Sequence, residues 1–132
     1  MENYLIATHG NLAKELINTL KLLSGEALEN CQTLCAYTED RDPETTIRTM
    51  IEQLGDEQQL VVFADMFGSS VSNFFMEYQT DPRIFLITGV NVDLLINVIL
   101  LNQELPLVQR IEEAIQQSRD RMLLIMKGKK DE

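Results

Sequence analysis

Residues 60–64 read Leu-Val-Val-Phe-Ala, and residues 65–70 continue as Asp-Met-Phe-Gly-Ser-Ser. The first run is continuously apolar and too short for a buried helix, so it predicts a strand that is covered on both faces. The second run has a carboxylate, a glycine and two serines, which are typical of a turn that leads into a helix. A buried strand followed by such a loop and a helix is the building unit of a parallel α/β sheet.

Three other apolar runs have the same character. Helical patterns fill the gaps between the runs, so the chain alternates β and α units with right-handed crossovers. The commonest sheet for four or five such strands has the order 2-1-3-4, in which the first and third strands are adjacent. We therefore predict an α/β fold, a flavodoxin-like three-layer sandwich around a mainly parallel sheet. The three further strands are predicted at residues 4–7, 33–37 and 84–87.

Five helices are predicted from apolar periodicity and from start and stop signals. The first has Asn11 as its cap and Gly25 just past its end, and its predicted apolar face comprises Leu12, Leu16, Leu20 and Leu23. The second opens with Asp42-Pro43 and stops at Gly55. The others are predicted at about residues 70–78, at 92–101 and from Pro106 onward. Residues 122–126, Met-Leu-Leu-Ile-Met, either prolong the fifth helix or form an antiparallel C-terminal edge strand.

The composition limits the class of protein. The chain has 132 residues, 45% apolar and 24% charged, which fits one globular domain. We place this domain at residues 1–127 and a frayed tail at residues 128–132. The net charge of -10 leaves no basic surface for nucleic acid. No apolar run reaches the ~18 residues of a membrane span, and the N-terminus has no signal-peptide core, so we expect a cytoplasmic protein.

The counts of cysteine and histidine restrict the chemistry. Cys31 and Cys35 have no further cysteines with which to complete a zinc shell, so they are interpreted as two buried thiols. His9 is the one histidine of the chain, which rules out metal sites built from several imidazoles. We expect no metal and no cofactor, and any histidine chemistry must occur at His9.

Polar residues follow the two strands that are predicted to be adjacent. Thr8-His9-Gly10 comes after the first strand, and Asp65 opens the loop after the third. Open α/β sheets bind ligands at this switch point. A carboxylate that accepts a hydrogen bond from one imidazole nitrogen fixes the tautomer and leaves the other nitrogen as a nucleophile. Backbone N–H groups at the starts of the first and third helices, with the serines of the 65–70 loop, could hold a phosphate-sized anion.

The residues by themselves leave other interpretations open. A lone histidine is more often a surface or core residue than a catalytic one, and residues 68–70 could form only a turn and a helix cap. A receiver-type regulator, phosphorylated on Asp65, would need an acidic pair for magnesium where this chain has Thr8-His9-Gly10. The chain has no P-loop motif, and no serine- or threonine-rich phosphate loop of a flavin-binding module follows the first strand.

Three motifs in order resemble those of one family. They are Ile-Ala-Thr-His-Gly at residues 6–10, the 65–70 loop, and Thr-Gly-Val-Asn at residues 88–91. Along nearly its whole length the chain is similar to the IIA component of the mannose-type (mannose, fructose, sorbose) phosphoenolpyruvate-dependent sugar phosphotransferase system of bacteria. The resemblance implies a phosphotransferase, a histidine phosphocarrier of sugar transport. It also implies HPr as phosphoryl donor and a IIB component as acceptor, with the membrane components IIC and IID acting later on the sugar.

The resemblance also implies roles for single residues. His9 matches the phosphoacceptor, Asp65 matches the aspartate that orients it, and Ser70 matches the serine that helps to bind the phosphoryl group. The remaining predicted phosphate-binding residues match the pocket wall and its rim: Thr8, Gly10, Phe67, Gly68 and Ser69. The chain departs from the family where Gly-Ser-Ser-Val at residues 68–71 replaces Gly-Gly-Ser-Pro, and where Asp93 replaces a proline. These departures leave the histidine and the aspartate in place.

The resemblance further implies a homodimer, because the family exchanges C-terminal strands between subunits, and residues 122–126 would be the exchanged strand. The nearly all-apolar helix at 92–101 favours a dimer independently, since such a helix must be buried. Two other roles would also use His9: a phosphorylation-dependent regulatory module, and the phosphoryl donor of a dihydroxyacetone kinase. The resemblance also implies that the sugar never touches this component, so its pocket encodes no sugar specificity, and the sequence does not identify the IIB partner.

Overall fold

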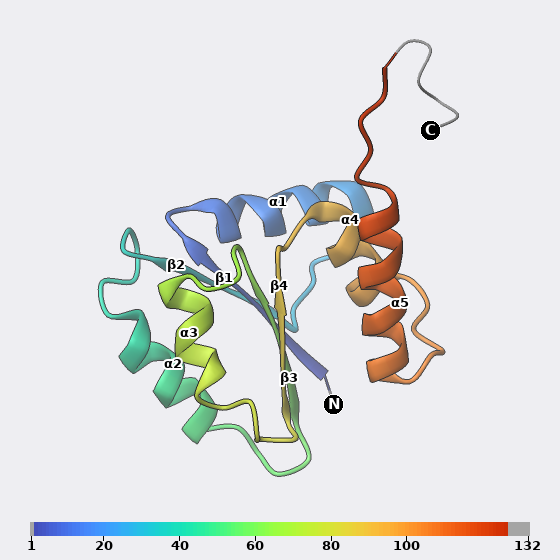
Figure 1. Cartoon of the computed structure of the whole chain (residues 1–132). Coiled ribbons are helices and arrows are strands. Elements are labelled where there is room, and N and C mark those ends of the chain that lie inside the picture. Colours follow the sequence, from blue (N-terminus) through green and yellow to red (C-terminus); the bar gives the residue numbers. More distant parts are fainter. Residues whose placement is uncertain (1, 127–132) are drawn as a thin grey trace. The chain divides into compact units, whose positions relative to one another are not determined.

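The computed structural model describes residues 2–126, and its central feature is a parallel sheet (Figure 1). Within this part of the chain the sheet has four strands in the order β2-β1-β3-β4, and each pair is parallel. The predicted order and the flavodoxin-like arrangement are therefore confirmed. The strands are β1 (Glu2–His9), β2 (Cys31–Ala36), β3 (Gln59–Ala64) and β4 (Ile84–Thr88).

The register of β1 and β3 brings the two polar loops together. Ala7 of β1 is paired with Ala64 of β3, and His9 is paired with Ala36 of β2. Because the strands are parallel, the residues that follow Ala7 and Ala64 emerge at the same edge of the sheet. The loops after β1, β2 and β3 therefore meet at the carboxyl end of the sheet.

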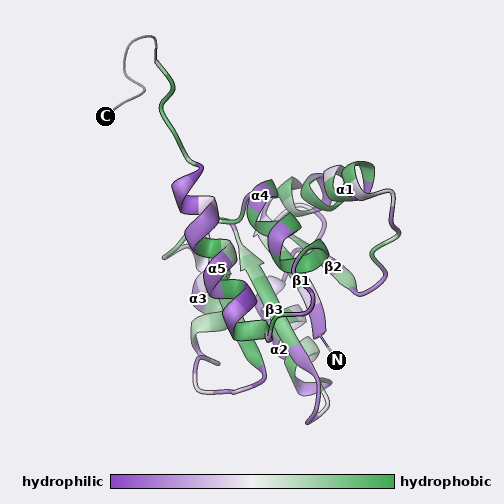
Figure 2. Cartoon of the chain, turned by 90° about the vertical axis from the view of Figure 1, so that its right-hand side faces the viewer, coloured by the Kyte–Doolittle hydropathy of each residue, from purple (hydrophilic) through white to green (hydrophobic). Residues whose placement is uncertain are grey.

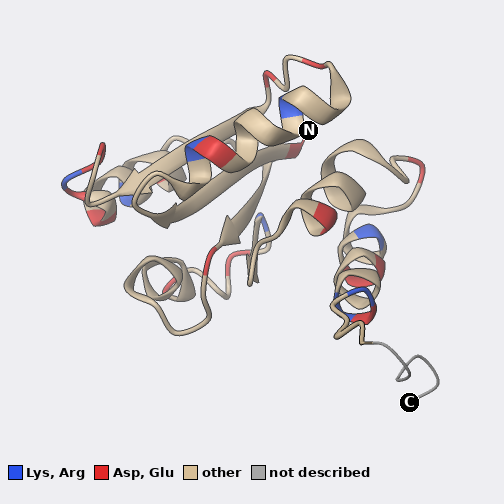
Figure 3. Cartoon of the chain, turned by 90° about the horizontal axis from the view of Figure 1, so that it is seen from above, with Lys and Arg blue, Asp and Glu red and all other residues tan. Residues whose placement is uncertain are grey.

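Helices cover both faces of this sheet, as the predicted three layers require. Helix α1 (Leu12–Ser24) lies against β1 and β2 on one face, and α2 (Pro43–Glu52) and α3 (Ser70–Met76) lie on the other (Figure 1). Charged side chains belong mainly to helices and loops, whereas the strands are almost free of them (Figure 3). The core on the side of α2 and α3 comprises Leu5, Ala7, Leu34, Ala36, Ile47, Ile51, Leu60, Val62, Val71, Phe75 and Ile84.

The predicted apolar face of α1 is only partly confirmed. The buried side chains are Ala13, Ile17 and Leu20, whereas Leu12 is 46% exposed and Leu23 is 60% exposed. The buried hydroxyl of Thr8 accepts from the N–H of Ala13 at 2.7 Å, so the first turn of α1 is bonded to the end of β1 on this side.

The signals for the ends of the first helix are only partly confirmed. Asn11 occupies the N-cap position but makes no capping hydrogen bond with its side chain, which accepts from Thr38 Oγ1 at 2.8 Å instead. Gly25 ends the helix in the left-handed conformation, with φ of 72°, as predicted.

Helices α2 and α3 begin where the sequence predicts. Asp42 caps α2 by accepting from the N–H of Thr45 at 3.3 Å, and Pro43 is the first helical residue. Ser69 caps α3 by accepting from the N–H of Ser72 at 3.3 Å. Both helices end earlier than predicted, at Glu52 and at Met76.

The chain divides into two compact units between Val92 and Asp93. The second contains most of α4 (Val92–Leu95), the π-helical turn η1 (Ile96–Leu100) and α5 (Leu107–Asp120). The helix predicted at 92–101 is present without a gap from Val92 to Leu100, but its second half, Ile96–Leu100, is π-helical. The side-chain amide of Asn97 donates to the carbonyl of Asp93 at 2.8 Å, and the N–H of Leu101 bonds to the carbonyl of Ile96, five residues back. A side chain that enters the helical ladder in this way shifts the backbone into a π-turn.

Residues 122–126 neither prolong α5 nor form a strand within this chain. Helix α5 ends at Asp120, and all five of the following apolar side chains from Met122 to Met126 are exposed, the least of them at 49%. Figure 2 shows this segment as a hydrophobic stretch beyond the helix. The predicted frayed tail, residues 128–132, lies outside the described residues, and a single domain over 1–127 stays a prediction. Across residues 2–126, no helix has both the length and the apolarity to span a membrane.

Candidate functional site

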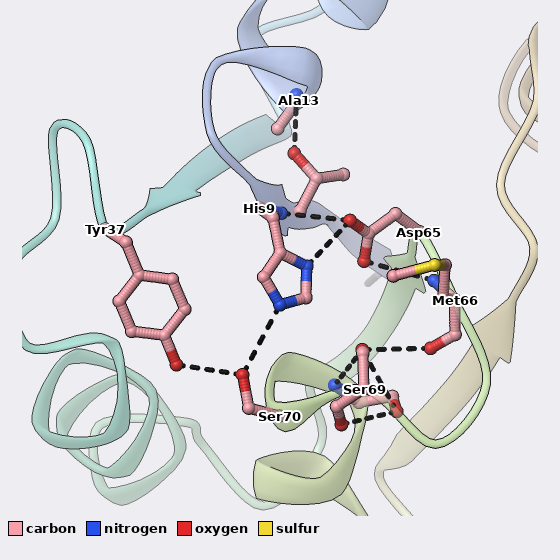
Figure 4. A network of polar contacts seen from close by, with 9 residues as sticks. His9, Ala13, Tyr37, Asp65, Met66, Ser69 and Ser70 are labelled. Atoms are coloured by element: carbon pink, nitrogen blue, oxygen red, sulfur yellow. Dashed lines mark hydrogen bonds and ion pairs between the residues drawn. The ribbon is translucent and has the colours of Figure 1, made fainter.

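His9 and Asp65 form a pair at the carboxyl end of the sheet (Figure 4). His9 is the last residue of β1, and Asp65 is the first residue after β3. One carboxylate oxygen of Asp65, Oδ2, accepts from the backbone N–H of His9 at 3.0 Å and lies 2.9 Å from the imidazole Nδ1. The other oxygen, Oδ1, accepts from the N–H of Met66 at 3.1 Å. The pair that the sequence predicts is therefore in contact, and three hydrogen-bond contacts hold the carboxylate of Asp65 in place.

The electrostatics of the pair fix the state of the ring. Burial acts to raise the pKa of Asp65, but the hydrogen bonds from His9 outweigh it and hold this pKa below its ordinary value. Asp65 is therefore ionised near neutral pH and can only accept hydrogen bonds. The proton between the two side chains must lie on Nδ1, so in the neutral ring Nε2 carries a lone pair.

The second imidazole nitrogen faces a hydroxyl. Ser70 Oγ lies 3.4 Å from His9 Nε2, and the side chain of His9 is 36% exposed. Figure 4 shows the ring between Asp65 on one side and Ser70 on the other. The nitrogen that carries the lone pair in the neutral ring is thus the one that is turned toward the loop and solvent.

The 65–70 loop is held by its own hydrogen bonds. Ser69 Oγ donates to the carbonyl of Met66 at 2.9 Å and also caps α3. The hydroxyl of this serine is therefore used in hydrogen bonds within the loop and the start of α3. Gly68 has φ of +79°, a conformation that other residues rarely adopt, which explains the glycine at this position. Phe67 is 82% exposed at the rim. Ser69 and Gly68 therefore shape the loop that presents Ser70 to His9.

Thr8 and Gly10 flank His9 in the sequence, and each takes part in a hydrogen bond that supports the backbone around it. Thr8 is fully buried, and its hydroxyl accepts from the N–H of Ala13, so it supports the start of α1. The N–H of Gly10 donates to the carbonyl of Ala36 at 2.9 Å, and its φ is +62°. Both residues hold the turn that follows His9.

One residue of this site was not predicted. Tyr37 follows β2, its hydroxyl lies 2.9 Å from Ser70 Oγ, and its ring centroid lies 5.8 Å from that of His9. The signal was available, because the loop after the second strand must open at the same edge as the loop after the first. The predicted strand at 33–37 included Tyr37, whereas β2 ends at Ala36.

The described residues contain no cluster of three or more His, Cys, Asp or Glu side chains that could hold a metal ion. The chemistry that this arrangement can perform is nucleophilic. It combines an oriented imidazole, an ionised carboxylate behind it, and a hydroxyl in front of it.

The fold and the site together define a flavodoxin-like domain with a histidine–aspartate pair at the switch point. The family model of the fructose IIA component of the phosphotransferase system matches residues 3–116. The chain therefore belongs to this family of IIA components, which confirms the resemblance seen in the sequence. A comparison with curated protein sequences gave no significant match.

Solved structures agree with this assignment. A candidate phosphoenolpyruvate-dependent sugar phosphotransferase system permease from Klebsiella pneumoniae is 27% identical, covering 93% of this chain and 90% of that one, with a TM-score of 0.86. The mannose/sorbose-specific IIA subunit from Enterococcus faecalis shares the fold at 17% identity, with a TM-score of 0.80 and 95% of each chain covered. The IIA protein associated with the fucose utilization operon of Streptococcus pneumoniae shares it at 22% identity, with a TM-score of 0.71, covering 88% of this chain and 90% of that one.

Proposed function

We propose that this IIA component accepts a phosphoryl group from HPr on Nε2 of His9 and passes it to a histidine of a IIB component. In this proposal the chain acts in the cytoplasm. The transfer is one step of a sugar uptake that ends at the membrane components IIC and IID. The observation that carries the proposal is the pair formed by His9 and Asp65, in which Nδ1 is bound at 2.9 Å and Nε2 faces outward.

The transfer needs little covalent chemistry from the protein. The lone pair of His9 Nε2 attacks the phosphorus of phosphorylated HPr, a new N–P bond forms, and the N–P bond of the donor breaks. The electron pair of the broken bond stays on the imidazole of HPr. His9 then carries a phosphoryl group on Nε2 and a proton on Nδ1, and the charge of Asp65 stabilises this cationic ring. The transfer to IIB is the same reaction with His9 as the donor.

The phosphoryl group would be held by the loop that faces Nε2. Ser70 supplies a hydroxyl at 3.4 Å from this nitrogen, and the glycine at position 68 leaves the loop without a side chain there. In this proposal Thr8, Gly10 and Ser69 act by shaping the pocket, while Phe67 forms part of its rim. Donors that are fixed before the reaction cost no reorganisation during it.

The proposal includes a homodimer. Its support is the apolar segment 122–126, whose side chains are exposed in the single chain, since exposed apolar stretches of this kind mark interaction sites. The nearly all-apolar pattern at 92–101 is weaker support than the sequence suggested, because Leu94, Leu95 and Val98 are already buried within one chain.

The experiment is phosphorylation with purified enzyme I, HPr and labelled phosphoenolpyruvate. We expect one phosphoryl group per chain, which is labile in acid and stable in base, as a phosphohistidine is. His9→Ala should abolish the labelling while the far-ultraviolet circular dichroism stays unchanged. Label that survives in His9→Ala, or that resists acid, would contradict the proposal.

A further inference from the structure

Tyr37 has a backbone conformation that is costly for its residue type. Its φ is +70°, in the left-handed region that a bulky side chain rarely adopts. The turn is nonetheless fixed, because the N–H of Tyr37 donates to the carbonyl of Asp40 at 2.7 Å and the N–H of Asp40 donates to the carbonyl of Cys35 at 3.0 Å. Strained residues that their surroundings hold in place tend to lie at functional sites.

This conformation sends the phenol ring toward the imidazole. The two ring centroids lie 5.8 Å apart, with 33° between the ring planes, and the Tyr37 hydroxyl lies 2.9 Å from Ser70 Oγ. Figure 4 shows Tyr37, His9 and Ser70 together, each from a different part of the chain: the end of β2, the end of β1 and the start of α3.

The direction of each hydrogen bond follows from the charge of Asp65. Because the carboxylate holds the proton on Nδ1, Nε2 of the neutral ring can only accept, and Ser70 must donate to it. The single proton of the Ser70 hydroxyl is then committed to Nε2. The Tyr37 hydroxyl must therefore be the donor in its contact with Ser70 Oγ. The donors form one chain that runs from Tyr37 through Ser70 to His9.

We propose that Tyr37 is a positioning residue, which fixes the Ser70 hydroxyl in front of Nε2 of His9. When a phosphoryl group occupies Nε2, this nitrogen no longer accepts, and the Ser70 proton is free to turn to a phosphoryl oxygen. Tyr37 continues to hold the serine oxygen in place during this change. The effect of Tyr37 on phosphoryl transfer rests on the proposed function. The effect of Tyr37 on the unphosphorylated imidazole of His9 does not depend on transfer.

The first test is spectroscopic and uses the fact that His9 is the one histidine of the chain. The ¹⁵N resonance of Nε2 is measured at a pH where the ring is neutral, in the wild type and in Tyr37→Phe, which keeps the ring but lacks the hydroxyl. We expect the resonance to move in the same direction as in Ser70→Ala. The matched control is Tyr78→Phe, because Tyr78 packs against the core of the sheet, and it should leave the resonance unchanged.

The second test is a double-mutant cycle on the rate of phosphorylation by HPr. Tyr37→Phe should slow the transfer roughly tenfold, the effect of about one hydrogen bond, and Tyr78→Phe should not change it. Because Tyr37 acts through Ser70, the double variant with Ser70→Ala should be no slower than Ser70→Ala alone.

Two outcomes would overturn the proposal. One is an unchanged Nε2 resonance in Tyr37→Phe, and the other is strict additivity of the two variants in the cycle. Failure of the proposed function would look different, because the wild type would then take up no label on His9 while the resonance still responded to Tyr37→Phe. Circular dichroism of each variant shows whether the fold is intact, and Tyr37→Leu provides a second variant without the hydroxyl.

Discussion

Asp65 contributes more to the site than a fixed position for His9. Its carboxylate accepts from two groups of His9 and from the N–H of Met66, so its geometry and its charge are both used. The amide of an asparagine has a similar shape but no charge, and it can present an N–H group to Nδ1 instead of an oxygen. The substitution therefore separates the charge of residue 65 from its shape.

Asp65→Asn should slow phosphoryl uptake by roughly two to four orders of magnitude, by analogy with other orienting carboxylates behind a catalytic imidazole. The rate of labelling by HPr measures this effect, and the affinity for HPr, measured by titration calorimetry, should change little. Asp56→Asn, at an exposed loop position, is the matched control and should keep the wild-type rate. If Asp65→Asn keeps that rate too, Asp65 only holds the loop.

The same residue predicts a pH dependence of stability. The pKa of Asp65 lies below its ordinary value of 3.8 in the folded chain, so folding favours the carboxylate form. The stability gained in this way is fully present above the ordinary pKa, and it is lost as the pH falls through the folded pKa. We expect the difference in free energy of unfolding between wild type and Asp65→Asn to be largest near neutral pH and to shrink toward pH 2. Urea titrations across this range measure it, and a constant difference would contradict the linkage.

At the scale of elements, α1 depends on a residue from the strand before it. The buried hydroxyl of Thr8 satisfies the N–H of Ala13 in the first turn of the helix, where backbone N–H groups have no helical partner. Thr8 also lies one residue from His9, so α1 and His9 share one support.

Thr8→Val keeps the volume of the side chain but leaves this buried N–H without its acceptor. The variant should lose about 1–3 kcal/mol of stability, as expected for an unsatisfied buried donor. Chemical denaturation measures the loss. Thr33→Val, at an exposed position of β2, is the control and should change the stability far less. Equal effects of the two substitutions would show that the hydroxyl of Thr8 is not needed.

At the scale of the whole molecule, the exposed apolar segment at 122–126 bears on the number of chains in the assembly. Five consecutive apolar residues, 122–126, are exposed in the single chain, although burial of such side chains is favourable. A second copy that covers them would remove this exposure. The homodimer in our proposal depends on this segment.

Light scattering at micromolar concentration should give about twice the chain mass of 15.1 kDa. The double substitution Leu124→Asp and Ile125→Asp should halve the observed mass, because two charges would have to be buried in the interface. Leu22→Asp is the matched control, since Leu22 is an 83% exposed apolar residue of α1, and it should leave the mass unchanged. A wild-type mass near that of one chain would refute the dimer.

The amino-acid sequence by itself determined the parallel sheet, the strand order and the pair formed by His9 and Asp65. The buried strands are short, continuous apolar runs, and the order 2-1-3-4 places the ends of β1 and β3 together, so local patterns were sufficient. The start of α2 was equally local, because Asp42 and Pro43 act within one turn.

Only the structure decided features that depend on which polar atoms pair when the elements pack. The hydroxyl of Thr8 bonds to the first turn of α1, and the side-chain amide of Asn97 bonds to Asp93 where the π-turn follows α4. Helix α5 ends at Asp120 although an apolar run follows at 122–126. Tyr37 joins the site because a left-handed residue after β2 meets the first residue of α3, 33 positions along the chain. Sequence periodicity reports which residues are apolar, but it does not report which polar atom a buried hydroxyl will reach, and that choice is made when the elements pack.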